Sequence, residues 1–247
     1  MLKSILSRTP DGIRKWIYRS PPLHRLASKA SAVIWRDDSW QWRRITGGAA
    51  EGLWIQVQPR TQKFQVSGSY EPSVHRVLAA HAAGGVVWDV GAHIGYFVLV
   101  ALRMGSEVVA IEPNPENARR IRAALARNRL DATLIEAAVG AREGSAYLDV
   151  QGESSTGRLA AEGIPVSVTT LDSVYEQREI APPSFVKIDI EGSEGNVLLG
   201  AERMLAEARP KLLIELHPWV DAKDVFDHLA AYEWREVDDG HIFASPR

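Results

Sequence analysis

Ionisable side chains follow an apolar stretch in the second half of the chain. The segment FVKIDIEGSE (residues 185–194) places Lys187, Asp189 and Glu191 at alternate positions. Side chains alternate between the two faces of a β-strand, so these three point the same way if the strand extends that far. Such a group at a strand end can transfer protons or bind a metal ion. The alternative is a Lys187–Asp189 ion pair, with Glu191 and Glu194 stabilising the start of the next helix.

A second apolar stretch, LIELHP (residues 213–218), ends in the same way. Its Glu215 and His217 share one face of an expected strand. A single histidine is most often structural, but a histidine beside one carboxylate and near Asp189 is typical of a functional cluster. We therefore expect the two strands to be neighbours and to form one site.

A loop with two glycines follows an earlier apolar stretch. In VWDVGAHIG (residues 87–95), Gly91 and Gly95 frame a turn from a strand into a helix, where open α/β sheets bind ligands. The spacing lacks the middle glycine of the dinucleotide fingerprint, and Asp89 would repel a phosphate but suits a sulfonium or an amino group. This pattern favours S-adenosylmethionine over NAD. The alternative is that the glycines serve only the turn and its packing.

Glu112 ends the next expected strand, 17 residues after Gly95. A carboxylate at this place can accept hydrogen bonds from both hydroxyls of a ribose. Because Pro-Asn-Pro follows, Glu112 can equally be a charge at the start of the next helix.

Alternating strands and helices must position these groups. We expect strands at residues 86–90, 107–111, 132–136, 145–150, 166–169, 185–190 and 211–216. We expect helices at residues 72–83, 96–104, 115–128, 194–206 and 222–231. Two hairpins are expected at residues 52–68, around Pro59-Arg60, and at residues 234–244, around Asp239-Gly240.

Strands separated by helices predict right-handed βαβ units with helices on both faces of the sheet. The expected fold class is therefore α/β, with a Rossmann-like, mainly parallel, doubly wound sheet and a C-terminal antiparallel hairpin. Dehydrogenases share this architecture, so the fold alone does not establish the function.

Composition narrows the class of protein. The 247 residues fit one sizeable α/β domain with a small extension. The absence of cysteine excludes thiolate chemistry and favours a cytoplasmic location. No stretch approaches the roughly 18 apolar residues of a spanning helix. The net charge of −2 argues against a nucleic-acid partner.

Basic residues concentrate near the N-terminus. Residues 1–44 contain ten Lys and Arg against three Asp, a net charge of +7, interspersed with aromatic residues. One interpretation is a peripheral contact with an anionic membrane surface or an acidic protein. We favour the other, a packed lid or subunit contact whose charges are solvated.

From about Gly52 to Ala244 the sequence resembles the FkbM-type family of S-adenosylmethionine-dependent methyltransferases. One departure is His93, where the family usually has Asn. The matching motifs are SGSYEP (67–72), WDVGAHIGYF (88–97), VVAIEPNPEN (108–117), EAAVG (136–140), TLDS (170–173), FVKIDIEGSEGNVLLGAE (185–202) and RPKLLIELH (209–217).

The resemblance implies a class I methyltransferase domain at residues 51–247, after a basic, aromatic extension at residues 1–50. It implies S-adenosylmethionine as the donor and a hydroxyl oxygen of a sugar, a glycolipid or polysaccharide unit, or a polyketide-type product as the acceptor. We therefore expect a small-molecule or glycan acceptor. The positions matched to cofactor binding are Tyr70, Glu71, Asp89, Gly91, His93, Gly95 and Glu112, with Glu136 near the adenine.

Methylation of a hydroxyl group removes its proton, which requires a general base or a divalent cation. We expect Asp189 or His217 to accept the proton, with Glu215 orienting His217 and Lys187 polarising the site. The rival mechanism places Mg²⁺ or a similar ion on Asp189, Glu215 and His217. The predicted catalytic residues are Lys187, Asp189, Glu191, Glu215 and His217. A nucleic-acid methyltransferase and a non-catalytic nucleotide-binding module stay open as alternatives.

Overall fold

The computed structural model describes residues 39–149, 158–217 and 219–247. The chain divides into two compact units, Met1–Glu71 and Pro72–Arg247. Most of the predicted N-terminal extension, including the basic residues up to position 38, lies outside the described residues. The separation of residues 1–50 from residues 51–247, and any membrane or protein contact of the basic segment, therefore stay predictions.

The first unit contains a small antiparallel pair, β1 (Gln41–Arg44) with β2 (Trp54–Val57), followed by helix α4 (Lys63–Ser67). The predicted hairpin at residues 52–68 was therefore wrong. Its first half is a strand, but that strand pairs with residues before it. Its second half is a helix that buries Phe64 and ends at Gly68 in the left-handed conformation. A short apolar run of this kind does not distinguish a helix from a strand.

The second unit is built on a seven-stranded sheet with the order β12-β13-β11-β10-β3-β4-β5. Neighbouring strands are parallel except for β13, which is antiparallel to β11 and β12. This confirms the predicted doubly wound sheet and its C-terminal hairpin. The strands are β3 (Val86–Val90), β4 (Glu107–Ile111), β5 (Thr133–Ile135), β10 (Phe185–Ile188), β11 (Lys211–Glu215), β12 (Tyr232–Glu236) and β13 (His241–Pro246).

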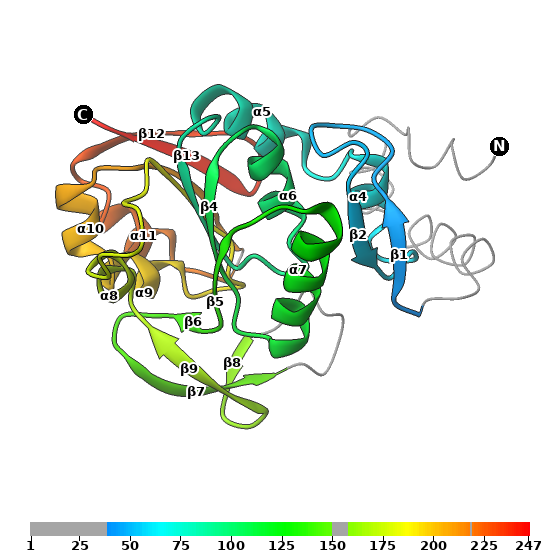
Figure 1. Ribbon diagram of the computed structural model, residues 1–247. Coiled ribbons are helices and arrows are strands. Elements are labelled where there is room, and N and C mark those ends of the chain that lie inside the picture. The colour runs from blue at the N-terminus through cyan, green and yellow to red at the C-terminus, as the bar shows by residue number, and fades with distance from the viewer. Residues whose placement is uncertain (1–38, 150–157, 218) are drawn as a thin grey trace, which may run out of the picture. The chain divides into compact units, whose positions relative to one another are not determined.

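Helices cover both faces of this sheet, and α8 to α11 group on one side of it (Figure 1). The predicted helix at residues 194–206 is two helices, separated at Gly200, the C-cap residue of the first. A Cβ on Gly200 would lie 2.2 Å from the carbonyl oxygen of Gly140, so only glycine fits there. The helices are α5 (Pro72–His81), α6 (Tyr96–Arg103), α7 (Pro115–Asn128), α8 (Leu171–Tyr175), α9 (Glu194–Leu199), α10 (Glu202–Glu207) and α11 (Ala222–Asp227).

Strand alternation separates the core from the site. Trp88 and Val90 of β3 and Val186 and Ile188 of β10 belong to one buried cluster, with apolar residues of α8 to α11. The intervening residues of these strands point to the other face. One of them, Lys187, lies over the Phe97 ring of α6, 5.2 Å from its centroid. A charged residue of the sheet is thus buried beneath a helix.

A second sheet, ordered β6-β9-β7-β8, joins the expected strands near residues 145–150 and 166–169. It consists of β6 (Ala138–Val139), β7 (Gly144–Asp149), β8 (Arg158–Ala160) and β9 (Ile164–Thr169).

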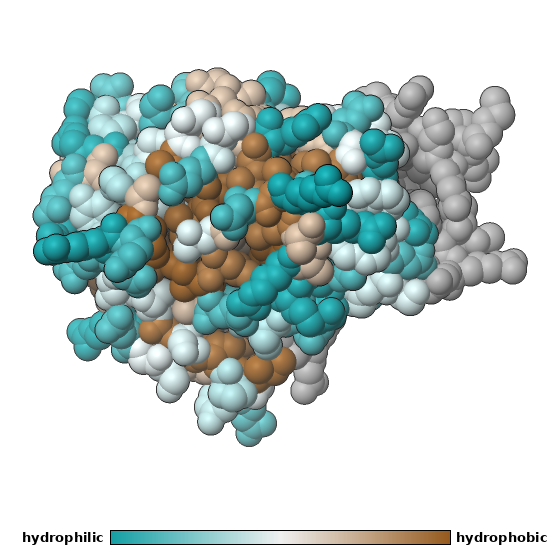
Figure 2. Space-filling model, viewed as in Figure 1, coloured by the Kyte–Doolittle hydropathy of each residue, from teal (hydrophilic) through white to brown (hydrophobic). Residues whose placement is uncertain are grey.

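Apolar residues lie between hydrophilic ones on the molecular surface drawn in Figure 2. Among the described residues, no helix combines the length and apolar character needed to cross a membrane.

Candidate active site at the sheet switch point

The strand order reverses between β3 and β10, and open α/β sheets bind ligands at the carboxyl ends of strands at such a point. The two strands are parallel and in register, with Lys187 beside Asp89 and Ile188 beside Val90. The glycine loop after β3 and the acidic segment after β10 therefore start at the same level. The sequence prediction that these motifs belong together is consistent with this register.

Lys187 is 3% exposed and contacts two carboxylates. Its Nζ lies 2.9 Å from Oδ2 of Asp189 and 3.6 Å from Oδ1 of Asp89. The ion pair considered from the sequence is therefore present. It neutralises charge inside the site, and any direct catalytic role of Lys187 stays a prediction.

The pKa values of the two aspartates shift in opposite directions. Burial raises the pKa of Asp89, and the Lys187 charge only partly opposes this. Burial also raises the pKa of Asp189, but the Lys187 charge and a hydrogen bond shared with the Glu215 carboxyl group outweigh it and bring the pKa to about 2. Asp189 is thus ionised at neutral pH, at the outer end of the Lys187 pair.

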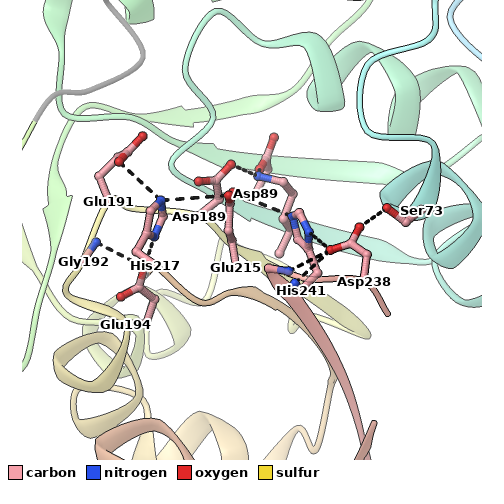
Figure 3. Close-up of polar contacts among 12 residues, drawn as sticks. Ser73, Asp89, Asp189, Glu191, Gly192, Glu194, Glu215, His217, Asp238 and His241 are labelled. Carbon is pink, nitrogen blue, oxygen red and sulfur yellow. Dashed lines mark hydrogen bonds and ion pairs between the residues drawn. The ribbon is translucent and has the colours of Figure 1, made fainter. Parts of the chain in front are cut away.

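His217 lies among carboxylates from three positions (Figure 3). Its Nδ1 is 2.7 Å from Oε1 of Glu194, while its Nε2 is 3.3 Å from Oε2 of Glu191 and 4.0 Å from Oε1 of Glu215. The expectation that Glu215 orients His217 stays a prediction, with the two groups 4.0 Å apart. The fully buried Glu194, which the sequence analysis did not assign to His217, makes the shorter contact from the first turn of α9. Only the folded chain brings residues 194 and 217 together.

The surroundings of His217 favour a positive charge on it. Burial lowers its pKa, but the hydrogen bond with Glu194 and the charges of Glu194, Glu191 and Asp189 raise it above the ordinary value. One oxygen each of Asp189 and Glu215 and one nitrogen of His217 lie within 4.8 Å of one another. These three residues, the predicted metal ligands, could therefore hold one cation.

A second histidine approaches Glu215 and was missed by the sequence analysis. Glu215 of β11 is the partner of His241 in β13, and Nε2 of His241 lies 3.7 Å from Oε2 of Glu215. Nδ1 of His241 lies 2.9 Å from Oδ1 of Asp238, whose Oδ2 accepts a hydrogen bond from Ser73 (Figure 3). Burial raises the pKa of Asp238, but these contacts bring it to about 2. The only signal in the sequence was an Asp-x-x-His spacing at the predicted hairpin turn.

The glycines of the loop after β3 are explained first by packing. Gly91 has a φ of 83°, and a Cβ there would lie 1.8 Å from the carbonyl oxygen of Asp189. A Cβ on Gly95, also at φ 83°, would lie 3.0 Å from the Ile121 side chain. The alternative considered from the sequence, that these glycines serve the turn, is what the structure shows. Ligand clearance is an additional role that stays a prediction.

His93 and Glu112 hold this loop to the next strand. His93 has a φ of 51°, a conformation that Asn and His tolerate better than most residues, and its backbone N–H donates to Oε2 of Glu112 over 2.7 Å. Oε1 of Glu112 accepts from the backbone N–H of Asn114 and, at 3.3 Å, from the side chain of Asn117. Burial raises the pKa of Glu112 to about 7, although these hydrogen bonds oppose it.

The other residues predicted to bind the cofactor are Glu136, Tyr70 and Glu71. Glu136 follows β5, is 38% exposed in its side chain, and forms an ion pair with Arg122. Tyr70 and Glu71 end the first unit of the chain. Their predicted roles toward a cofactor stay predictions.

Comparison with known proteins identifies the family. Residues 89–237, more than half of the chain, match the Methyltransferase FkbM domain. The chain belongs to the FkbM methyltransferase family. This confirms the resemblance inferred from the motifs.

Two relatives of this FkbM-family chain have assigned acceptors. The hexuronic acid methyltransferase AglP of Haloferax volcanii is 30% identical over 161 residues, covering 63% of this chain and 66% of AglP. The 31-O-demethyl-FK506 methyltransferase FkbM of Streptomyces tacrolimicus is 32% identical over 156 residues, covering 48% of this chain and 60% of that enzyme. The matched region thus spans less than two thirds of each relative.

A solved structure agrees with the fold. The putative methyltransferase yhhF from Escherichia coli matches with a TM-score of 0.50 at 14% identity, covering 84% of this chain and 99% of that one. The Rossmann-like methyltransferase architecture predicted from the sequence is thereby confirmed.

Proposed function

We propose that this protein transfers a methyl group from S-adenosylmethionine to a hydroxyl oxygen of a sugar unit. The observation that carries the proposal is the His217–Glu194 pair, which lies beside the carboxylates of Asp189 and Glu215 at the switch point of the sheet. Membership of the FkbM family supports methyl transfer. The name of the relative AglP, a hexuronic acid methyltransferase, supports a sugar acceptor.

The residues at the loop after β3 fit the proposed cofactor. Both carboxylate oxygens of Asp89 are buried and accept no hydrogen bond from the described part of the chain. Lys187 lies 3.6 Å from Oδ1, so Oδ2 is the oxygen that suits a cationic or N–H-bearing ligand group. Oε2 of Glu112 accepts one hydrogen bond from His93 and retains acceptor capacity for a ribose hydroxyl. When bound here, S-adenosylmethionine supplies a methyl group attached to a positively charged sulfur.

His217 is the proposed general base. Glu194 at Nδ1 fixes the ring so that Nε2 faces the site, where the neutral form of the imidazole can accept the hydroxyl proton. The same carboxylate stabilises the imidazolium that results. Lys187 holds the ionised Asp189 beside this position, where Asp189 can accept a hydrogen bond from the acceptor and orient it.

A divalent cation is the rival to a general base. Asp189, Glu215 and His217 supply two carboxylates and an imidazole, a donor set that suits Mn²⁺ or Zn²⁺ as well as Mg²⁺. Such an ion would lower the pKa of the acceptor hydroxyl. Dialysis against a chelator separates the two mechanisms. Full activity afterwards excludes the ion, and activity restored only by added metal excludes the metal-free mechanism.

The negatively charged side chains around His217 argue against the two alternative functions, a nucleic-acid methyltransferase and a non-catalytic nucleotide-binding module. Asp189, Glu191 and Glu215 are partly exposed carboxylates around His217, an unfavourable surface for a nucleic-acid backbone. A module that only holds a nucleotide has no need of this cluster.

The test is release of S-adenosylhomocysteine from S-adenosylmethionine with a panel of methyl glycosides, uronic acids and simple alcohols. We expect turnover with a sugar, and kcat values at least about 100-fold lower for Asp189→Asn and His217→Ala. Binding of S-adenosylhomocysteine and the melting temperature are the controls. Near-normal turnover by both variants would refute the catalytic assignment. Tight cofactor binding without release for any acceptor would favour the non-catalytic module.

A further inference from the structure

A large aromatic side chain lies exposed beside the proposed base. Trp219 follows β11 and is 54% exposed. Its ring centroid lies 5.1 Å from that of His217, with 30° between the ring planes. More than half of the surface of this residue is thus exposed, next to a buried histidine–carboxylate pair.

The backbone after β10 leaves room for this indole. Gly192 has a φ of 114°, and a Cβ there would lie 2.5 Å from Nε1 and 3.0 Å from Cδ1 of Trp219. Gly192 also donates its backbone N–H to Glu194, the partner of His217. The indole is therefore held between the Gly192 turn and the His217 ring, and its position is tied to that of the base.

Hydrogen-bond acceptors surround the same place. Glu191, Asp189 and Glu215 are each between one fifth and one third exposed in their side chains. A pyranose ring has C–H groups on its faces, which pack on aromatic rings, and hydroxyl donors on its rim. An aromatic surface bordered by carboxylate oxygens is complementary to both parts of such a ring.

We propose that Trp219 is the acceptor-binding platform, on which a pyranose ring stacks so that a hydroxyl on its rim reaches His217. This inference rests on the proposed function, since it names the substrate class of the same site. Because carboxylates border the platform, the ring presents hydroxyl groups to them, and any anionic substituent points away.

The experiment compares Trp219→Ala and Trp219→Phe with wild type, and uses Trp234→Ala as the matched control. Trp234 is 46% exposed and stacks on Phe226, 4.3 Å between centroids, at the edge strand β12. Binding of methyl pyranosides is measured by ligand-observed NMR in the presence of S-adenosylhomocysteine. KM and kcat are measured for every pyranoside that is methylated.

We expect Trp219→Ala to raise Kd and KM for the pyranoside by about tenfold while the Kd of S-adenosylhomocysteine stays unchanged. Trp219→Phe should retain most of the affinity, and Trp234→Ala all of it. Pyranoside binding that depends on Trp219 without methylation would support the platform and refute the proposed function. Unchanged pyranoside affinity in Trp219→Ala, an altered cofactor affinity instead, or no binding of any pyranoside would overturn the platform.

Discussion

Two histidine–carboxylate pairs approach Glu215 on either side of it in Figure 3. In each, Nδ1 of the histidine contacts an acidic side chain, Glu194 for His217 and Asp238 for His241. In each, Nε2 faces Glu215, at 4.0 Å from Oε1 for His217 and at 3.7 Å from Oε2 for His241. The local arrangement is nearly the same, so the two pairs must be distinguished by what surrounds them.

The surroundings differ in the charges near Nε2. His217 has Glu191 at 3.3 Å and Asp189 nearby, and it borders the exposed Trp219. His241 is paired along the β11–β13 ladder, and its partner Asp238 is bonded to Ser73 of α5. The His217–Glu194 pair therefore suits proton transfer, whereas the His241–Asp238 pair suits the positioning of Glu215. Variants of the four residues test this difference in role.

Replacing each histidine by alanine should separate the pairs most strongly. We expect His217→Ala to lower kcat by about 100- to 10,000-fold, because the proton acceptor is lost. His241→Ala should lower it by about tenfold, because Glu215 loses only a supporting contact. Steady-state kinetics with an acceptor identified from the proposed panel provides the measurement. An equal decrease in kcat for both variants would contradict the proposed difference in role between the two histidines.

Removing the charge of each partner should give the next largest difference. Glu194→Gln should lower kcat by about 10- to 100-fold, since the imidazolium of His217 loses its counter-charge. Asp238→Asn should change kcat by less than about fivefold. Cofactor affinity is measured alongside and should not move in either variant. A larger decrease in kcat for Asp238→Asn than for Glu194→Gln would indicate that His241, rather than His217, is the general base.

Low pH should lower the free energy of unfolding by protonating Asp238, the partner of His241. The pKa of Asp238 is about 2 in the folded protein and near 3.8 without the fold, so its stabilisation is complete above pH 4 and is lost as the pH falls toward 2. Wild type should therefore lose about 2 kcal/mol more stability than Asp238→Asn between pH 5 and pH 2. Urea unfolding at several pH values measures this. Parallel curves for the two proteins would show that Asp238 does not contribute.

The smallest effect should come from outside both pairs, at Glu112. Its pKa of about 7 means that its carboxylate ionises as the pH rises from 6 to 8, and the ionised form is the better acceptor for ribose hydroxyls. Affinity for S-adenosylhomocysteine should increase by up to about tenfold over that range in wild type. Glu112→Gln should show no such increase in calorimetric titrations. His217→Ala and His241→Ala should keep the wild-type pH dependence of cofactor affinity. That result would place both histidine–carboxylate pairs at the acceptor rather than at the cofactor.

Local patterns predicted most of this arrangement. Apolar stretches and turn residues located the strands of the main sheet, and alternation predicted that Lys187 and Asp189 share a face. The contacts that distinguish the two pairs could not be read in this way. Glu194 resembles any acid in a first helical turn until α9 lies against His217, and Asp238 resembles any turn residue until α5 brings Ser73 to it. These are tertiary contacts between distant parts of the chain.

The close approach of Gly91 to the carbonyl oxygen of Asp189 has a consequence for mutagenesis. Any side chain at position 91 must separate the loop after β3 from the end of β10 that carries Asp189, so one substitution displaces two parts of the proposed site. A Gly91 variant that fails to bind cofactor therefore says little about contacts between Gly91 and that ligand. The loop after β3 and the end of β10 are packed so closely that a change of backbone position in one requires a matching change in the other.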